Sequence, residues 1–278
     1  MHPAADPRRA YRGPLRAVIF DWAGTTVDFG SCAPVLAFAQ AFADAGIELS
    51  LEEIRADMGL PKLDHVRKLR TVPRVAQRWE SLHGAAMSEA DVERVYLAFV
   101  ERQAAQVAAR CEPIPGVLDV VAALRGRGIR VGSNSGYPRA VMERLAPAAA
   151  ARGYAPDVIV CGDEVAQGRP SPFMAWRALE LLGVWPAAAC VKVDDTLPGV
   201  EEGLNAGMWT VAVAMTGNEL ALTAEELEAL PALEREARRE EAYRRLAAAG
   251  AHYVVDSAAD LADCIDQIEN RLERGETP

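Results

Sequence analysis

The sequence predicts an α/β fold, a doubly wound, Rossmann-like parallel sheet that carries an inserted helical cap domain. Short apolar runs rich in β-branched residues alternate with segments of helical periodicity, which is typical of parallel strands covered by helices. The stretch 51–110 differs, because it is charged and helical and contains no strand-like run. Half of the 278 residues are hydrophobic, so the chain can bury the core that this fold requires.

The first strand and the cap occupy the N-terminal part of the chain. Ala17–Phe20 is a short apolar run, interpreted as a buried strand, and Asp21 follows it. Helices are predicted over 32–45, 51–58, 62–69, 74–82 and 88–110, with Gly46 and two prolines as breaks. We therefore expect a core domain of residues 1–29 and 112–278 and a helical cap domain of residues 30–111.

The C-terminal part of the chain returns to alternating strands and helices. Strands are predicted over 129–132, 158–160, 190–193, 210–214 and Tyr253–Val255. Helices are predicted over 117–127, from 138 onward, and over 172–182, 199–206 and 258–274. The segment 223–249, rich in Glu and Arg at i,i+4 spacing, is predicted to be a solvated helical excursion.

The amino-acid composition restricts the kinds of molecule that the protein is expected to bind. The formal net charge of −10 argues against nucleic acid and against an anionic membrane surface, but not against a small anionic substrate. No apolar run approaches the roughly 18 residues that span a bilayer, and residues 1–13 lack the apolar core of a signal peptide. The five cysteines are scattered, which is typical of free thiols in a reducing compartment. We therefore expect a cytoplasmic protein without nucleic-acid or membrane partners.

Polar clusters follow four of the predicted strands. They are Asp21, Ser133-Asn134-Ser135, Gly168-Arg169-Pro170 and Asp194-Asp195. Each cluster alone has an ordinary explanation as a helix cap, a surface loop or a solvated helix N-terminus. Because the C-terminal ends of parallel strands meet at one crevice, the four clusters together favour a ligand site there.

These groups suit phosphoryl transfer. Asp21 is the candidate nucleophile, which would form an aspartyl-phosphate. Asp21 and an acid of the Asp194-Asp195 pair can hold Mg²⁺ through hard oxygen ligands. Arg169 would offset charge on the transferring group, while Ser133 and backbone N–H groups of the next helix would bind its oxygens.

With these motifs the chain resembles the haloacid dehalogenase superfamily of phosphotransferases over nearly its whole length, including the helical insertion after the nucleophile. Phosphatases of that superfamily carry a general acid two residues after the nucleophile, and here that position is Ala23. A phosphate ester needs its leaving oxygen protonated, so Ala23 speaks against an ordinary phosphatase.

The cap turn Met58-Gly-Leu-Pro-Lys62-Leu-Asp-His65 resembles the substrate-specificity loop of the phosphonoacetaldehyde hydrolase family. The segments Asp-Trp-Ala-Gly-Thr-Thr-Val-Asp at 21–28, Gly-Ser-Asn-Ser-Gly-Tyr at 132–137, Val-Asp-Asp-Thr at 193–196 and Asn-Ala-Gly-Met-Trp at 205–209 resemble the same family. The resemblance implies hydrolysis of the P–C bond of phosphonoacetaldehyde to acetaldehyde and phosphate, in 2-aminoethylphosphonate degradation.

The resemblance implies that Lys62 forms a Schiff base with the substrate aldehyde. Breaking a P–C bond would expel a carbanion, and an iminium on Lys62 would accept its electrons, so that a neutral enamine departs. Lys62 must be neutral to condense; a pKa lowered from about 10.4 to about 8 would raise the neutral fraction at pH 7 to roughly a tenth, and burial and positive neighbours push the pKa in that direction. His65, three residues on along the same helix face, would relay protons.

The resemblance also assigns the rest of the site and an assembly. The Mg²⁺ ligands are expected to be Asp21, the backbone carbonyl of Ala23 and Asp195, with Asp194 open as a direct ligand or as a substitute for an acid that some relatives carry at Gly199. The phosphoryl group is expected to bind Ser133, Asn134 and Arg169. Met58 and Tyr137 are expected to line the pocket. A homodimer is expected.

Three alternatives stay open. A Mg²⁺-dependent sugar-phosphate phosphatase or phosphomutase of the same superfamily would tolerate Lys62→Arg. A dehalogenase that uses Asp21 would work without a metal and would leave Asp195 without a purpose. A non-catalytic scaffold that binds partners through its acidic surface would not need Asp21, Arg169, Asp195 and Lys62 together.

Overall fold

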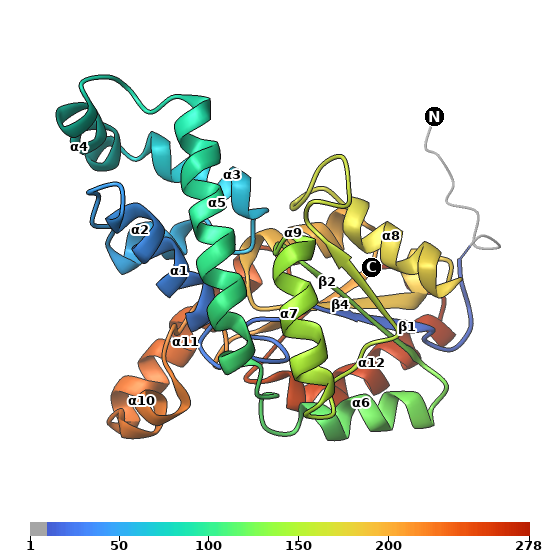
Figure 1. Ribbon diagram of the computed structural model, residues 1–278. Coiled ribbons are helices and arrows are strands. Elements are labelled where there is room, and N and C mark those ends of the chain that lie inside the picture. The colour runs from blue at the N-terminus through green and yellow to red at the C-terminus, as the bar shows by residue number, and fades with distance from the viewer. Residues whose placement is uncertain (1–9) are drawn as a thin grey trace, which may run out of the picture.

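The computed structural model describes residues 10–278 and places one six-stranded parallel sheet at the centre of the larger domain (Figure 1). The strand order is β3-β2-β1-β4-β5-β6, with the strands at Ala17–Phe20 (β1), Arg130–Ser135 (β2), Val158–Cys161 (β3), Cys190–Asp194 (β4), Trp209–Val213 (β5) and Tyr253–Val255 (β6). All five strand pairings are parallel. The predicted α/β fold with a doubly wound parallel sheet is confirmed.

Helices cover both faces of the sheet because its strands are apolar on both faces. Alternate residues of β1 enter two different cores: Val18 and Phe20 join one cluster, whereas Ala17 and Ile19 join another. The first face is covered by α6 (Val117–Gly126), α7 (Arg139–Ala150) and α12 (Leu261–Glu273). The second face is covered by α8 (Phe173–Leu182), α9 (Leu197–Asn205) and α11 (Ala232–Ala248).

The segment after β1 forms a separate layer of helices beside the sheet (Figure 1). Its helices are α1 (Cys32–Ala43), α2 (Leu51–Ala56), α3 (Lys62–Thr71), α4 (Pro73–His83) and α5 (Glu89–Gln106), followed by a 3₁₀ turn at Val107–Arg110. They enclose a core of their own that includes Phe38, Trp79 and Phe99. Capping boxes at Ser50 and Ser88 fix the starts of α2 and α5.

The charged segment 223–249 is helical, as predicted, but it consists of two helices. α10 (Ala224–Ala229) and α11 are separated at Leu230 and Pro231, because a proline disfavours helical backbone in the residue before it. α11 buries Ala242 and Leu246 against the sheet side, so this part of the excursion contributes to the core.

One boundary error of the sequence prediction affects the site, and it concerns β2. We predicted residues 129–132, and the strand extends to Ser135 with Asn134 pairing to Val160 of β3. Polar residues hid this end of the strand, since Ser-Asn-Ser resembles a turn. Two further 3₁₀ turns, Ala187–Ala189 and Ala258–Asp260, precede β4 and α12.

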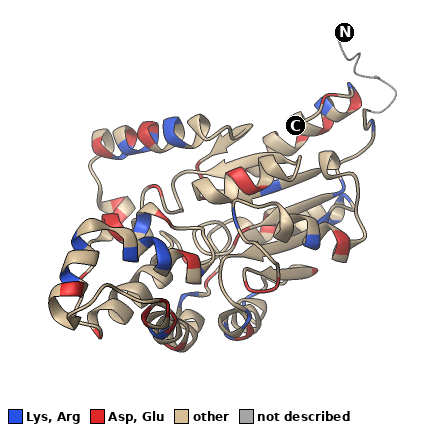
Figure 2. Ribbon diagram, turned by 90° about the horizontal axis from the view of Figure 1, so that it is seen from above, with Lys and Arg blue, Asp and Glu red and all other residues tan. Residues whose placement is uncertain are grey.

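Charged residues of both signs are spread over the outer helices (Figure 2). Within residues 10–278 no helix combines the length and apolar character needed to cross a membrane. All five cysteines, which lie within this range, are free thiols.

Candidate active site

The register of the sheet brings three polar residues to one level at the C-terminal ends of neighbouring strands. Phe20 of β1 pairs with Ser133 of β2 and with Val193 of β4. The residues that follow are Asp21, Asn134 and Asp194, so their side chains emerge side by side on the same face. The ends of β1, β2 and β4 therefore converge at one place, as predicted.

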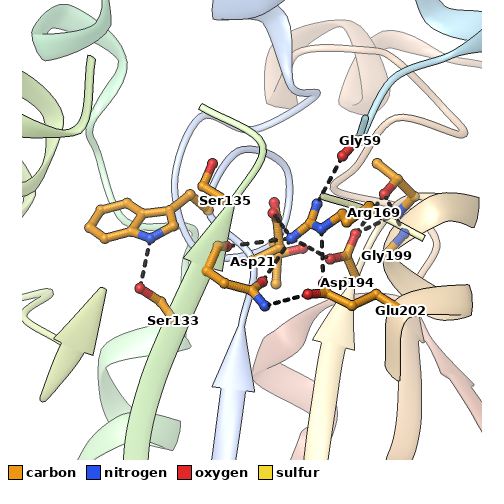
Figure 3. Close-up of polar contacts among 12 residues, drawn as sticks. Asp21, Gly59, Ser133, Ser135, Arg169, Asp194, Gly199 and Glu202 are labelled. Atoms are coloured by element: carbon orange, nitrogen blue, oxygen red, sulfur yellow. Dashed lines mark hydrogen bonds and ion pairs between the residues drawn. The ribbon is translucent and has the colours of Figure 1, made fainter. Parts of the chain in front are cut away.

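Arg169 joins these three side chains (Figure 3). Its Nη2 donates to Asp21 Oδ1 at 2.7 Å and to Asn134 Oδ1 at 2.9 Å, and it lies 3.0 Å from Asp194 Oδ2. Its Nε donates to Glu202 Oε2 at 3.0 Å. Arg169 is only 4% exposed, so water competes weakly for these contacts and the guanidinium is held rigidly over the nucleophile.

Two buried charged residues that the sequence analysis did not identify, Lys192 and Glu202, hold Asn134 and Asp194 in place. Lys192 Nζ donates to Asn134 Oδ1 at 2.8 Å and to Asp194 Oδ2 at 2.7 Å. Glu202 Oε1 accepts from Asn134 Nδ2 at 2.9 Å, opposite its bond to Arg169. The signal for Lys192 was present, since a lysine inside an otherwise apolar strand needs a buried partner.

Three carboxylates lie close enough together to bind one metal ion. One oxygen each from Asp21, Asp194 and Asp195 can be chosen so that all lie within 4.8 Å of one another. Burial, followed by repulsion from Asp21 and Asp194, raises the pKa of Asp195 well above its usual value. Burial and the Asp194 charge also raise the pKa of Asp21, in spite of Arg169. A divalent cation would relieve this repulsion, and hard oxygen ligands suit such an ion.

A count of buried charges agrees with a divalent ion. The site contains four buried acids, Asp21, Asp194, Asp195 and Glu202, against two buried cations, Arg169 and Lys192. In the state that can condense, in which Lys62 is neutral, four negative and two positive charges leave a balance of −2; with Lys62 protonated, as most of it is at pH 7, the balance is −1. Either balance is negative, so a bound cation would compensate it.

The two adjacent aspartates have different surroundings. Asp194 Oδ1 accepts from the backbone N and Oγ1 of Thr196, and its Oδ2 faces Lys192 and Arg169. Burial alone would raise the pKa of Asp194, but Arg169 and Lys192 lower it. A Cβ added at Gly199 would lie 2.0 Å from Asp194 Cγ, so this glycine leaves the space that the carboxylate fills.

Asp195 keeps more of its oxygen lone pairs free. Its Oδ1 accepts from Thr25 Oγ1 at 3.0 Å and its Oδ2 from the backbone N of Asn218 at 2.8 Å. One protein donor on each oxygen leaves room for a metal, whereas both oxygens of Asp194 face charged or multiple donors. The geometry thus favours Asp195 as the direct ligand, with Asp194 as the charge behind it.

The longer strand β2 changes the residue that faces the phosphoryl position. Ser133 Oγ accepts from Trp22 Nε1 at 2.8 Å and is fully buried one level below Asp21. Ser135, two residues on along the same face, reaches the end of the strand and lines the cavity beside Asp21. Ser133 thus lies against Trp22 and outside the cavity lining, whereas Ser135 lies in the cavity wall; phosphoryl binding by Ser133 stays a prediction.

Lys62 enters the site from the cap. Pro61 immediately precedes α3, so Lys62 lies in the first turn of that helix, and it is 5% exposed. Its Nζ lies 3.6 Å from Met58 Sδ, 5.4 Å from the ring centre of Tyr137 and 5.8 Å from that of Phe38. Burial lowers the pKa of Lys62 to about 8, with the negative charge of Asp21 opposing and Arg169 adding to the effect.

One small cavity joins the two halves of the site. It is lined by Asp21, Ala23, Ser31, Pro34, Met58, Gly59, Lys62, Ser135, Gly136, Tyr137, Arg169 and Thr196. Asp21 and Lys62 therefore face the same space, one from the core and one from the cap. Met58 and Tyr137 line it as expected. Burial raises the pKa of Tyr137 well above its usual value, so its hydroxyl stays protonated.

His65 lies close to this cavity but does not form its wall. Its ring packs on Phe38, with the centroids 4.3 Å apart, and is completely buried. Burial, and then the charge of Lys62, lower the pKa of His65 well below its usual value, so the imidazole is neutral at pH 7. Among residues 10–278, neither ring nitrogen makes a hydrogen bond of normal geometry, although the backbone of Ile54 lies close enough to oppose this lowering of the pKa.

Residues 15–207 match the family model of haloacid dehalogenase-like hydrolases. The chain is 52% identical to a phosphonoacetaldehyde hydrolase from Klebsiella pneumoniae over 266 residues, which is 95% of this chain and 99% of that protein. It is 48% identical to one from Paraburkholderia xenovorans over 264 residues, with the same shares.

Solved structures agree with these matches. A phosphonoacetaldehyde hydrolase-like protein from Oleispira antarctica matches with a TM-score of 0.96 and 45% identity, and the match covers all of both chains. A β-phosphoglucomutase from Clostridium difficile, 17% identical with a TM-score of 0.65 over 92% of this chain and 98% of that one, shares the fold.

Proposed function

The chain belongs to the haloacid dehalogenase-like hydrolase family, and from this premise we propose that it hydrolyses the carbon–phosphorus bond of phosphonoacetaldehyde, giving acetaldehyde and phosphate. The observation that carries the proposal is the shared cavity of Asp21 and Lys62. A carboxylate aimed at phosphorus and an amine of lowered pKa aimed at an aldehyde match the two ends of this substrate.

In the first half of the cycle the Lys62 amine adds to the aldehyde carbon. Loss of water from the carbinolamine then leaves a protonated imine. A Lys62 pKa of about 8 leaves roughly a tenth of the amine neutral at pH 7, against a few parts in ten thousand for an ordinary lysine. Met58, Phe38 and Tyr137 supply the apolar surroundings in which burial lowers the pKa of this amine.

In the second half the Asp21 carboxylate attacks phosphorus. The C–P bond breaks, and its electron pair moves into the iminium, so that an enamine stays on Lys62 and an aspartyl-phosphate forms on Asp21. The enamine takes a proton at carbon, and one water hydrolyses the resulting imine to acetaldehyde and free Lys62. A second water hydrolyses the aspartyl-phosphate. Ala23 fits this route, since the enamine departs without protonation by an acid at that position.

The other residues of the core hold the phosphoryl group and its charge. Arg169 contacts the nucleophile and is placed to stabilise the phosphoryl oxygens, while Asn134 orients Arg169. Asp21, the backbone carbonyl of Ala23 and Asp195 would hold a divalent ion, which we propose to be Mg²⁺. When bound, this ion supplies positive charge that offsets the charge of the phosphoryl oxygens.

We propose that His65 relays protons during dehydration of the carbinolamine and protonation of the enamine. Two ring nitrogens that lack protein partners are costly in a buried position, which favours a functional over a packing role. At pH 7 the neutral ring can accept a proton before it returns one.

The remaining proposals concern organisation. We propose that residues 30–111 act as a cap domain on a core of residues 1–29 and 112–278, supported by the separate cap core around Phe38 and Phe99. A cytoplasmic location is supported by the free cysteines. A homodimer is supported by the exposed Leu36 and Leu97 on cap helices α1 and α5. Light scattering of the purified protein tests the dimer.

The function is tested by assaying acetaldehyde and phosphate release from phosphonoacetaldehyde, with glucose 1-phosphate as the competing ester substrate. The wild-type chain should release both products in equal amounts, and Lys62→Arg should lose this activity almost completely. The proposal is wrong if the ester is the better substrate and Lys62→Arg leaves its hydrolysis unchanged.

A further inference from the structure

The cap segment 58–61, which precedes Lys62, rests on core residues that have no side chain. A Cβ added at Gly168 would lie 2.1 Å from Cγ of Pro61. One added at Gly136 would lie 2.7 Å from the carbonyl oxygen of Leu60 and 3.0 Å from that of Gly59. We call Gly136 and Gly168 the glycine seat.

The glycine seat requires glycine because the cap segment leaves no room for a side chain, and not because of its backbone conformation. Many glycines of this chain have a positive φ that would strain any other residue, but Gly136 and Gly168 are not among them. Their backbone conformations are open to alanine, and the three atoms nearest to an added methyl group at each position belong to the cap segment. Non-bonded carbon atoms approach to about 3.5–4.0 Å, so Gly168→Ala would have to displace Pro61 by about 1.5 Å.

The cap segment is also held at Gly59, between two other core groups. Arg169 Nη1 donates to the Gly59 carbonyl at 3.4 Å, and the Gly59 backbone passes so close to Thr196 that an added Cβ would lie 2.3 Å from its Oγ1. The guanidinium that contacts Asp21 therefore touches the same cap segment that the glycine seat supports.

We propose that Gly136 and Gly168 are positioning residues that set the distance between Lys62 and Asp21. The inference rests on the proposed function of Lys62. Because Lys62 directly follows Pro61, any lift of the proline moves the start of α3 and the amine with it. A displacement of about 1 Å can cost about a hundredfold in rate when two reacting groups must meet one substrate.

The test compares Gly168→Ala and Gly136→Ala with Gly126→Ala, a matched control at which an added Cβ meets nothing within 4 Å. Gly168→Ala should lower kcat at least tenfold, while Mg²⁺ affinity and Tm stay close to those of the control. A purely structural role would instead lower Tm together with kcat. Turnover of Gly168→Ala equal to that of Gly126→Ala would overturn the proposal.

A second variant relieves the contact. Pro61→Ala removes the Cγ and Cδ atoms that lie nearest to the added methyl, at 2.1 and 3.1 Å. The double variant Pro61→Ala/Gly168→Ala should therefore recover most of the turnover that Gly168→Ala loses, giving a large coupling in the double-mutant cycle. A double variant as slow as Gly168→Ala, or slower, contradicts the contact as the cause.

Hydrogen exchange separates this proposal from the proposed function. Backbone amides of segment 58–66 should exchange faster in Gly168→Ala and Gly136→Ala than in Gly126→Ala, whatever the substrate is. If the wild type releases no acetaldehyde, the proposed function fails, and the exchange result still decides whether the seat holds the cap segment. Unchanged exchange in both seat variants overturns the glycine seat.

Discussion

The two walls of the cavity differ in how their polar groups are satisfied. On the core side, Arg169 lies in the cavity wall and Lys192, Asp194 and Glu202 lie behind it, and the ion pairs among these four residues are 2.7–3.6 Å long; we call them, together with Asp21, the core wall. On the cap wall, Lys62 is surrounded by Met58 and two aromatic rings, and the nearby His65 ring has no hydrogen-bond partner within residues 10–278.

This difference shows how one site can bind a dianion and also lower the pKa of an amine. The core wall fixes charges in place, which suits a phosphoryl group whose charge must be balanced throughout the reaction. The cap wall buries Lys62 among apolar groups, and this burial lowers the pKa of Lys62 to about 8. An insertion between Asp21 and the rest of the core allows both environments to face one substrate.

The largest effect is expected where the nucleophile is removed from the core wall. Asp21→Asn keeps the shape of the side chain but should lower kcat by about 10⁴-fold or more, since no aspartyl-phosphate can form. The variant should still form an imine at Lys62, because the cap wall is intact. Phosphate release and mass spectrometry after borohydride reduction measure the two abilities separately. Loss of imine formation in Asp21→Asn would show that the two walls do not act separately.

A smaller loss is expected when the core wall keeps its charge but loses its geometry. Arg169→Lys retains one positive charge and cannot contact Asp21, Asn134 and Glu202 together, so kcat should fall by about 10²–10³-fold. Steady-state assays measure this, with Arg94→Lys on the exposed surface of α5 as the control. Activity within a few-fold of wild type would mean that Arg169 acts only as a point charge.

The core wall should also contribute to stability in a way that surface pairs do not. Glu202→Gln leaves the buried Arg169 with one carboxylate fewer, and the free energy of unfolding should fall by about 3 kcal/mol. The control Glu234→Gln disrupts an i,i+4 pair with the exposed Arg238 on α11 and should cost less than about 1 kcal/mol. Urea unfolding of both variants measures the difference, and equal losses would contradict the buried network.

The smallest effect is a pH dependence of the cap wall. Only the neutral amine condenses, so imine formation at Lys62 should fall about tenfold for each pH unit below a pKa of about 8 and become constant above it. Initial rates of borohydride trapping between pH 6 and 10 test this. A rate that keeps rising to pH 10 would mean that Lys62 titrates as an ordinary solvated lysine.

The sequence predicted which strand ends form the core wall better than it predicted strand boundaries and buried contacts. Polar residues that interrupt or follow an apolar strand could be found at the strand ends, and these are Asp21, Asn134, Arg169 and Asp194. The end of β2 was predicted three residues too early, and for this reason Ser135 in the cavity wall was not among the predicted site residues. Glu202 was missed because its partners Asn134 and Arg169 are distant in sequence and only the fold brings them together. Lys192 was missed although a lysine inside an apolar strand signals a buried partner.

The cap wall could be predicted only by resemblance. Periodicity placed Lys62 and His65 on one helix, but it could not show that Lys62 faces Asp21, because the docking of the cap depends on contacts between segments far apart in the chain. Gly136 and Gly168 illustrate this point. Glycine is needed at these positions because the cap segment covers them, and no local sequence pattern reveals that contact.

The most direct test of the division between the two walls is borohydride trapping with phosphonoacetaldehyde, followed by peptide mass spectrometry. The account predicts a reduced adduct on Lys62 and on no other lysine, with loss of activity in proportion to labelling. If Lys62 stays unmodified while the protein releases phosphate from this substrate, the amine has no covalent role and the account is contradicted.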